Sequence, residues 1–201
     1  MEKKKVILKQ AKRLFAKNGY DGTTMDEIAS QSNANKALIY YHFKSKENLY
    51  SCILKDSVNA IYDYLINKRG ESDNPKEALK IYIEAFFVQA KKDETFIRIL
   101  MREIASDGIH MSDEIMERFL CVLKILDNII KQGVNEGVFV ERDAKMVHFI
   151  VIGAISYYLS SCLLRKKLSK KFPSNEFLLR DVENVPLELY EIILKGLKSY
   201  G

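Results

Sequence analysis

The residue types best suited to contact an anionic polymer lie between residues 35 and 46. Tyr40 and Tyr41 follow Lys36 within one predicted helix, and Lys46 lies just beyond that helix. A tyrosine ring can contact a sugar or a thymine methyl group while its hydroxyl group reaches a phosphate, and lysine ammonium groups pair with phosphate oxygens. This combination predicts a surface that contacts nucleic acid.

The spacing of apolar residues predicts which side of this segment faces solvent. Ile39 and Phe43 are four residues apart, so they share one helical face, and we expect that face to point inward. Tyr40 and Tyr41 then point outward together with Ala37. In an alternative interpretation, one of the two tyrosines packs on the long helix that follows.

Two short helices, over residues 25–32 and 36–43, are expected from their start signals. The Thr24 hydroxyl group can accept the Glu27 amide while the Glu27 side chain returns to the Thr24 amide, which is a capping box. Asn35 can cap the second helix in the same way. Two short helices joined by a tight turn have the dimensions of a helix–turn–helix.

Three segments of the sequence resemble the N-terminal domain of TetR-type transcriptional regulators. They are Phe15-Ala16-Lys17-Asn18-Gly19-Tyr20, Thr23-Thr24-Met25-Asp26-Glu27-Ile28-Ala29 and Leu38-Ile39-Tyr40-Tyr41-His42-Phe43-Lys44-Ser45-Lys46-Glu47-Asn48-Leu49. The continuation Tyr-x-x-Phe-Lys-x-Lys-Glu makes the resemblance specific. The turn departs from the family pattern, because Asn33 stands in place of the usual glycine and Ala34 in place of a larger aliphatic residue. Asparagine tolerates the left-handed conformation, so we expect the turn to form.

The resemblance implies a role for each matching position. Thr24 would contact a phosphate at the start of its helix, and Lys46 would contact one at the start of the long helix. His42 has an alternative role as a neutral surface residue that forms hydrogen bonds. The implied partner is a double-stranded DNA operator. The recognition helix would carry Asn35, Lys36, Ala37, Tyr40, Tyr41 and His42.

Charge and composition agree with a small basic head on a neutral body. The chain carries +5 overall, but residues 1–55 carry +6 and residues 56–201 carry −1. Nine glycines and three prolines in 201 residues favour long helices over many short strands.

The first residues do not form an uninterrupted apolar stretch, so no signal peptide is expected. Three widely spaced cysteines without CxxC spacing are typical of the cytoplasm.

We predict an all-α fold of about nine helices. A three-helix, helix–turn–helix DNA-binding head over residues 1–46 would precede a larger helical body, over residues 47–201, for ligand binding and dimerisation. The expected helices span residues 3–18, 25–32, 36–43, 46–68, 75–92, 94–106, 112–136, 143–168 and 186–199.

The body holds most of the aromatic residues and most of the methionines. The resemblance implies that a small effector of unknown identity binds in this region, whereas an ordinary hydrophobic core is the alternative for any single residue. The residues expected to line the effector cavity are Tyr62, Phe86, Phe87, Phe96, Met101, Glu103, Met116, Phe119 and Leu123.

Glu103 is the most specific member of this set. It shares a helical face with apolar residues, where a carboxylate costs free energy unless it is paired. One interpretation is that Glu103 binds a cationic or hydroxylated ligand. The interpretation that we favour is an internal pair with Arg98, Arg102 or Arg118.

The helices over about 143–168 and 187–199 are the expected surface for a homodimer. Gly153, Ala154, Tyr157 and Ser161 share one face of the first helix, and the small residues there allow a second helix to approach closely. A similar stripe, Leu189, Ile193, Gly196 and Leu197, lies on the second helix.

Residues 146–164 carry no formal charge and are long enough to span a membrane, but we expect a buried helix there and no membrane partner.

Other classes of protein find less support in the sequence. His42, His110 and His148 lie in separate segments, and neither a glycine-rich phosphate loop nor a paired metal-ligand spacing is present. We therefore expect no catalytic site, no cofactor and no metal, and we expect His148 to be a core histidine. A helical interaction or adaptor protein that does not bind DNA remains the alternative, and the basic head argues against it.

Overall fold

The computed structural model describes residues 2–69, 73–174 and 184–198, and all regular structure in these ranges is helical. The prediction of an all-α fold is therefore confirmed. The chain divides into two compact units, one made of residues 1–60 and 93–119 and the other of residues 61–92 and 120–201. We call them unit 1 and unit 2. The functional division between residues 46 and 47 stays a prediction. The helices are α1 (Glu2–Asn18), α2 (Met25–Ser32), α3 (Lys36–Phe43), α4 (Lys46–Arg69), α5 (Pro75–Lys92), α6 (Glu94–Ala105), α7 (Asp113–Asn135), α8 (Ala144–Ser160), α9 (Cys162–Lys171) and α11 (Val185–Leu197).

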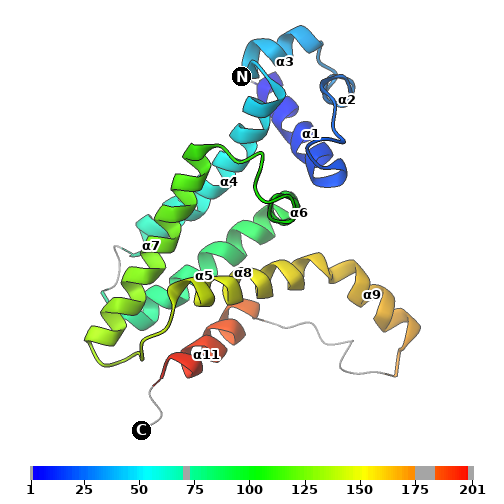
Figure 1. The fold of residues 1–201 in the computed structure, drawn as a ribbon. Helices are drawn as coiled ribbons and strands as arrows, with labels where there is room; N and C mark the ends of the chain where they lie inside the picture. The colour runs from blue at the N-terminus through cyan, green and yellow to red at the C-terminus, as the bar shows by residue number, and fades with distance from the viewer. Residues whose placement is uncertain (1, 70–72, 175–183, 199–201) are drawn as a thin grey trace. The chain divides into compact units, whose positions relative to one another are not determined.

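Helices α1, α2 and α3 pack together at the N-terminal end of unit 1 (Figure 1). Their core is formed by Ile7 and Phe15 of α1, Ile28 of α2, and Ile39 and Phe43 of α3, all of which are almost completely buried. The expected inward face of the segment 36–43 is thereby confirmed. Burial of this face holds α3 against the other two helices and fixes its opposite face toward solvent.

Local hydrogen bonds begin and end these short helices as expected. The Thr24 hydroxyl group accepts the Glu27 amide at 3.1 Å, and the Glu27 carboxylate accepts the Thr24 amide at 2.9 Å. Asn33 adopts the left-handed conformation with φ 47° and ψ 46°, and the Asn35 side chain accepts the Leu38 amide at 2.7 Å. The capping box, the left-handed turn residue and the second cap are all confirmed.

Helix α6 holds the C-terminal end of α1 within unit 1. The Arg102 guanidinium group donates hydrogen bonds to the carbonyl groups of Lys17, at 2.7 Å, and Ala16, at 3.3 Å. These are carbonyl groups of the last helical turn, where a positive charge is stabilising. Gly19 follows with φ +81°, the left-handed conformation that ends a helix and that glycine adopts without strain.

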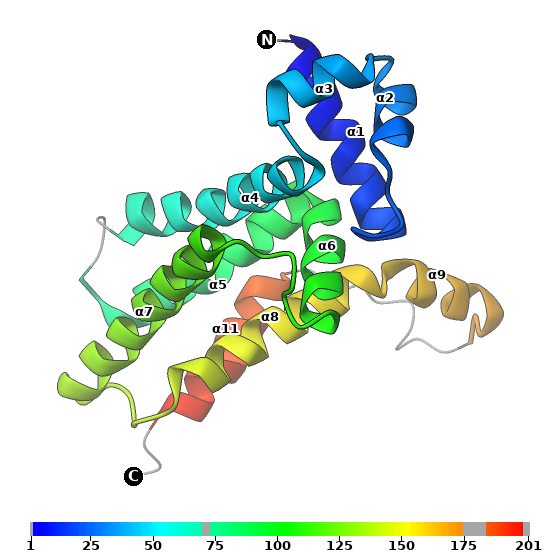
Figure 2. The same ribbon diagram turned by 45° about the horizontal axis from the view of Figure 1, so that its top comes forward.

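In unit 2, helix α5 packs against α8 and α11 (Figure 2). The contact between α5 and α8 includes a polar pair. The Tyr82 hydroxyl group lies 2.8 Å from Nδ1 of His148. Burial lowers the pKa of His148 to about 4 and raises the pKa of Tyr82. His148 is therefore a half-buried histidine with a hydrogen-bond partner on the neighbouring helix, in agreement with a structural role.

The expected single helix over 143–168 is wrong. The chain forms α8 and α9 instead, bent by 52° at Ser161. The Ser161 hydroxyl group bonds to the carbonyl group of Tyr158, and Arg165 donates to the same carbonyl group and to that hydroxyl group. Serine side chains compete with the helical hydrogen bonds in this way, and a pair of small polar residues is a common site of a kink.

The length and hydropathy of the helices also bear on membrane insertion. Among the residues described, no individual helix has the length and apolar character needed to cross a membrane. The bent pair α8 and α9 meets that criterion only when the two helices are taken together, and by length and composition alone.

Candidate nucleic-acid interface

Helix α3 presents its tyrosines to solvent. Tyr41 is 71% exposed and Tyr40 is 41% exposed, although both are large aromatic residues. Tyr41 is therefore open to solvent, whereas the ring of Tyr40 is partly covered. Lys36 and Ala37 are also exposed, and His42 is half-buried at the end of the same helix. The face opposite the buried one thus carries the aromatic and cationic groups that the sequence places there.

Lys36 is paired within the head. Its Nζ atom donates a hydrogen bond to Oδ2 of Asp26 at 2.9 Å, and both side chains are well exposed. The hydrogen bond to Asp26 raises the pKa of Lys36, so the ammonium group stays charged. A phosphate or a base that approaches Lys36 must compete with this carboxylate or lie beside it.

Two of the predicted contact residues already serve as helix caps. The Thr24 hydroxyl group donates to the Glu27 carboxylate at 3.1 Å and accepts the Glu27 amide. The Oδ1 atom of Asn35 accepts the Leu38 amide. A phosphate contact from the Thr24 hydroxyl hydrogen therefore requires that hydrogen to leave the Glu27 carboxylate, whereas the amide group of Asn35 keeps its own hydrogens for a contact.

Lys46 is positioned by an aromatic ring at the start of α4. Its Nζ atom lies 4.3 Å from the centre of the Tyr20 ring, a favourable cation–π distance. The Tyr20 hydroxyl group donates to Oε1 of Glu47 at 2.7 Å. Hydrogen bonds from Ser45 and from Tyr20 lower the pKa of Glu47 to about 2, while burial and the bond to Glu47 raise the pKa of Tyr20. Tyr20 therefore holds both residues that begin α4.

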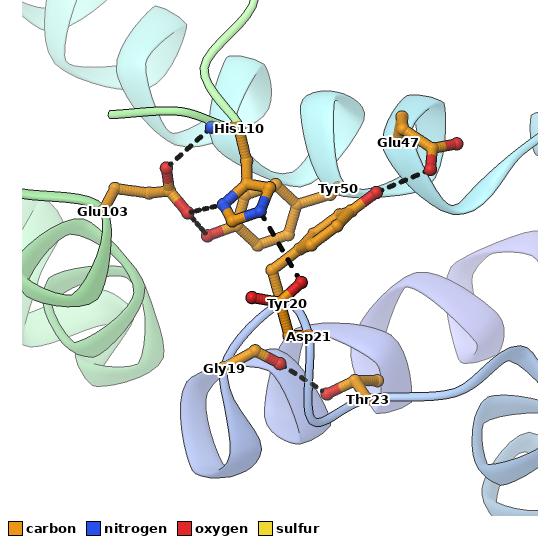
Figure 3. A network of polar contacts seen from close by, with 8 residues as sticks. All are labelled: Gly19, Tyr20, Asp21, Thr23, Glu47, Tyr50, Glu103 and His110. Carbon is orange, nitrogen blue, oxygen red and sulfur yellow. Dashed lines mark hydrogen bonds and ion pairs between the residues drawn. The ribbon is translucent and has the colours of Figure 1, made fainter. Parts of the chain in front are cut away.

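A buried carboxylate, Glu103, lies beside the rings of His110 and Tyr50 in unit 1 (Figure 3). Glu103 of α6 is 2% exposed, and its Oε1 atom accepts a hydrogen bond from the Tyr50 hydroxyl group of α4 at 2.5 Å. His110, in the turn after α6, contacts both oxygens of Glu103. Its Nδ1 atom lies 3.1 Å from Oε1, and its backbone nitrogen lies 3.3 Å from Oε2. Burial, and then the bond to Glu103, raise the pKa of Tyr50. Both oxygens of the carboxylate therefore have hydrogen-bond partners.

The ring of Tyr20 joins this buried group to the head. It stacks on the His110 ring with centres 4.0 Å apart and meets the Tyr50 ring edge-on at 5.1 Å. The Nε2 atom of His110 lies 3.9 Å from the Asp21 carboxylate (Figure 3). The turn after α1, the first turns of α4 and the turn after α6 therefore meet around one tyrosine.

The structure corrects the partner expected for Glu103. The sequence favoured an internal pair with an arginine, whereas Glu103 is paired with Tyr50 and His110. Arg102 directly precedes Glu103 on α6, so the two side chains point in different directions from the helix. The Arg102 side chain reaches the end of α1 instead. The interpretation as an internally paired carboxylate agrees with the geometry, but the arginine was the wrong partner.

The nine residues expected to line an effector cavity are divided between the two units. Three of them, Phe86, Phe96 and Glu103, are buried, whereas Met116 is 49% exposed. Leu123 lines an open hollow of about 750 Å³ in unit 2 whose other lining residues are mostly charged. Unit 1 contains Phe96, Met101, Glu103, Met116 and Phe119, and unit 2 contains Tyr62, Phe86, Phe87 and Leu123.

Sequence reasoning missed the residues that support the predicted contacts. Asp26 pairs with Lys36, and Tyr20 positions Lys46. Lys44 lies 5.7 Å from the centre of the Tyr41 ring and adopts φ +68° between α3 and α4. Tyr20, Asp26 and Lys44 all lie in the segments that carry the family resemblance, but their spacing along the chain does not reveal these contacts.

Two family models match the chain. The first, described as bacterial regulatory proteins of the tetR family, matches residues 7–52. The second, described as a tetracyclin repressor-like C-terminal domain, matches residues 75–174. The first match contains all the predicted contact residues, and the second covers α5 to α9.

Curated relatives and solved structures agree with these matches. The biofilm operon icaADBC negative regulator IcaR of Staphylococcus aureus (strain Newman) is 29% identical over 193 residues, which is 94% of this chain and 97% of that protein. The uncharacterised regulator YerO of Bacillus subtilis (strain 168) is 30% identical over 172 residues; the match takes in 84% of this chain but only 58% of the length of YerO.

Among solved structures, the regulator PfmR of Thermus thermophilus superposes with a TM-score of 0.72 at 24% identity, covering 96% of this chain and 99% of PfmR. A crystal structure of AibR in complex with isovaleryl coenzyme A and operator DNA gives a TM-score of 0.70 at 17% identity, covering 98% of both chains. At these identities the two superpositions establish the fold.

Proposed function

Because the chain belongs to the TetR family of bacterial regulatory proteins, we propose that it represses transcription by binding a pseudo-palindromic operator as a homodimer. Residues 1–46 bind the DNA, and residues 47–201 bind the effector and the second subunit. The observation that carries the proposal is the exposed face of α3, where Tyr40 and Tyr41 lie beside cations on a firmly capped helix–turn–helix.

An exposed apolar surface on α8 and α11 supports dimerisation. Phe149 and Tyr157 of α8 and Ile192 of α11 are each more than 60% exposed, which is costly in an isolated subunit. The stripe expected on α11 is wrong in part, because Leu189, Ile193 and Leu197 are buried within the subunit. A groove of about 520 Å³ lies between the two helices, with Ile150 and Gly196 among its lining residues. We assign this surface to a second copy of the chain, because the same residues in a partner can cover it around a two-fold axis.

The small residues on this surface favour close helix contact. Gly153 of α8 is exposed, and a Cβ atom added there would meet nothing within 4 Å. Ala154 is exposed beside it. Two copies of α8 can therefore approach each other closely, and a two-fold dimer would place its recognition helices about 34–36 Å apart, on successive turns of the major groove.

A small effector bound in the helical body completes the proposal. AibR was crystallised with an acyl coenzyme A and operator DNA together, which supports ligand control in a protein of this fold. Unit 1 offers a route by which α6 can affect the head, since Glu103 bonds to α4 and Arg102 bonds to the end of α1. The expected coupling between effector and operator is about 1–3 kcal/mol.

The proposal is tested by the salt dependence of binding to duplex DNA. Lys46→Ala should weaken binding to all sequences alike and reduce the slope of log K against log salt by about 0.9. Lys91→Ala, which removes an exposed lysine at the end of α5, is the matched control and should leave the slope unchanged. Absence of duplex binding by the wild-type protein at low salt would favour the adaptor alternative, and equal slopes for both variants would contradict the role of Lys46.

A further inference from the structure

The first turns of α1 carry lysines that the predicted interface does not include. Lys3, Lys4 and Lys5 are consecutive and exposed. Lys3 and Lys4 lie four and three residues before Ile7, which is completely buried where α1 packs on α2 and α3. They therefore lie on the side of α1 that faces the rest of the head, whereas Lys5 and Lys9, two residues from Ile7, lie on the opposite side.

One contact places this end of α1 beside the recognition helix. The Nζ atom of Lys4 lies 5.6 Å from the ring centre of Phe43, the last residue of α3. Lys44 follows Phe43 directly and is exposed, and Lys46 begins the next helix. Side chains from two separate segments therefore bring cations together at the C-terminal end of α3.

The stability of α1 does not explain these lysines. A positive charge in the first turn of a helix opposes the helix dipole, and Glu2 is the acidic residue of that turn. Among the residues that the structure describes, Lys3 and Lys4 have no ion-pair partner that would offset the cost. Neighbouring cations without a counter-charge also repel one another, and an anionic partner removes both costs.

From this placement we infer that Lys3 and Lys4 form a second phosphate-binding element of the head. They contact the DNA backbone next to the C-terminal end of α3, and they do so through their ammonium groups rather than through the end of the helix. Lysine is suited to this task because it is a flexible point charge without the fork geometry that reads a base. The inference rests on the proposed function and adds contacts to the same interface.

The test compares two double variants of the same helix. Lys3→Ala/Lys4→Ala and Lys5→Ala/Lys9→Ala each remove two charges from α1, but from opposite sides. Binding to a fluorescently labelled random-sequence duplex of about 30 base pairs is measured from about 50 to 200 mM KCl. The first variant should reduce the log–log slope by about 1.8, so that its affinity falls about ten-fold less than that of the wild type across this range. The second should retain the wild-type slope.

Three other outcomes would overturn the inference. Equal slopes for Lys3→Ala/Lys4→Ala and the wild type would show that these lysines do not touch phosphate. Equal reductions in both double variants would show an effect of net charge alone. A loss of helical circular dichroism in the first variant would show a structural role. Lys46→Ala distinguishes a failure of this inference from a failure of the proposed function. If Lys46→Ala reduces the slope and Lys3→Ala/Lys4→Ala leaves it unchanged, this inference is removed and the proposed function stays in place.

Discussion

The two units of the molecule bury polar groups in different ways. In unit 1, Glu103, Tyr50 and His110 form a connected set that joins α4, α6 and the turn after α6, and Tyr20 adds the end of α1. In unit 2, His148 pairs with Tyr82 between α8 and α5, and the buried hydroxyl group of Ser156 has no hydrogen-bond partner among the described residues. A connected network of this kind fixes relative positions more strictly than an apolar contact does.

This difference matches the tasks that we assign to the two units. The head must hold Lys46 and α3 in a defined geometry to fit a DNA groove, and the network around Tyr20 supplies directional contacts for that purpose. Unit 2 carries an exposed apolar surface on α8 and α11, which suits a second copy of the chain.

Removal of the buried carboxylate should cause the largest loss of stability. Glu103→Ala leaves the Tyr50 hydroxyl group and the His110 donors without a partner, which costs about 3 kcal/mol in the free energy of unfolding. Urea denaturation measures the change. Glu94→Ala, an exposed glutamate on the same helix, should change stability by less than about 0.5 kcal/mol. Similar values for the two variants would show that the network does not stabilise unit 1.

The histidine of unit 2 should make stability depend on pH. The pKa of His148 is about 4 in the folded protein and near 6.5 when unfolded, so the unfolded state binds more protons between these values. The contribution of neutral His148 to the free energy of unfolding is fully present above about pH 6.5. It is lost as the pH falls toward 4, which lowers the free energy of unfolding by up to about 3 kcal/mol. Urea unfolding of His148→Gln should lack this part of the decline, while His42→Gln should retain it. Parallel curves for His148→Gln and the wild type would contradict the burial of a neutral imidazole.

Loss of a helix cap in the head should have a smaller effect. Thr24→Ala removes the hydroxyl group that accepts the Glu27 amide, at a cost of about 1 kcal/mol in the free energy of unfolding. Ser30→Ala, at an exposed position in the last turn of α2, serves as the control and should be nearly neutral. Thermal unfolding of the two variants gives the comparison, and an equal midpoint for both would remove the capping box from the account.

The smallest predicted effect concerns DNA affinity. Asp26→Asn removes the carboxylate that pairs with Lys36 and also a negative charge beside the DNA, so binding to duplex DNA should tighten by about two- to five-fold. Asp56→Asn on α4 removes the same charge from another exposed position and should have no effect. Fluorescence anisotropy measures both variants. Weaker binding by Asp26→Asn would mean that Asp26 positions Lys36 for contact.

The same contrast explains how much of the molecule could be predicted from its sequence. The features of the head that were predicted correctly, such as the Thr24 capping box and the exposure of Tyr41, follow from interactions within four residues or from one helical face. The partners of Glu103 could not be predicted, because Tyr50 lies 53 residues away and only the tertiary structure brings the two side chains together.

Two further features show the limit of sequence patterns in the body. The break at Ser161 depends on hydrogen bonds that an uncharged, apolar stretch does not reveal. The residues expected to line an effector cavity are apolar and helical in spacing, and that pattern does not separate a ligand cavity from an ordinary core. Their division between the two units became visible only with the tertiary structure.

Selection of bound duplexes from a random DNA pool tests the central claim most directly. If the exposed face of α3 reads an operator in a two-fold dimer, selection by the wild-type protein should enrich a pseudo-palindrome whose half-sites lie about one helical turn apart. Tyr40→Ala/Tyr41→Ala should enrich no such sequence while still folding. A wild-type pool that stays random, or the same palindrome enriched by the double variant, would contradict the assignment of α3 as the recognition helix.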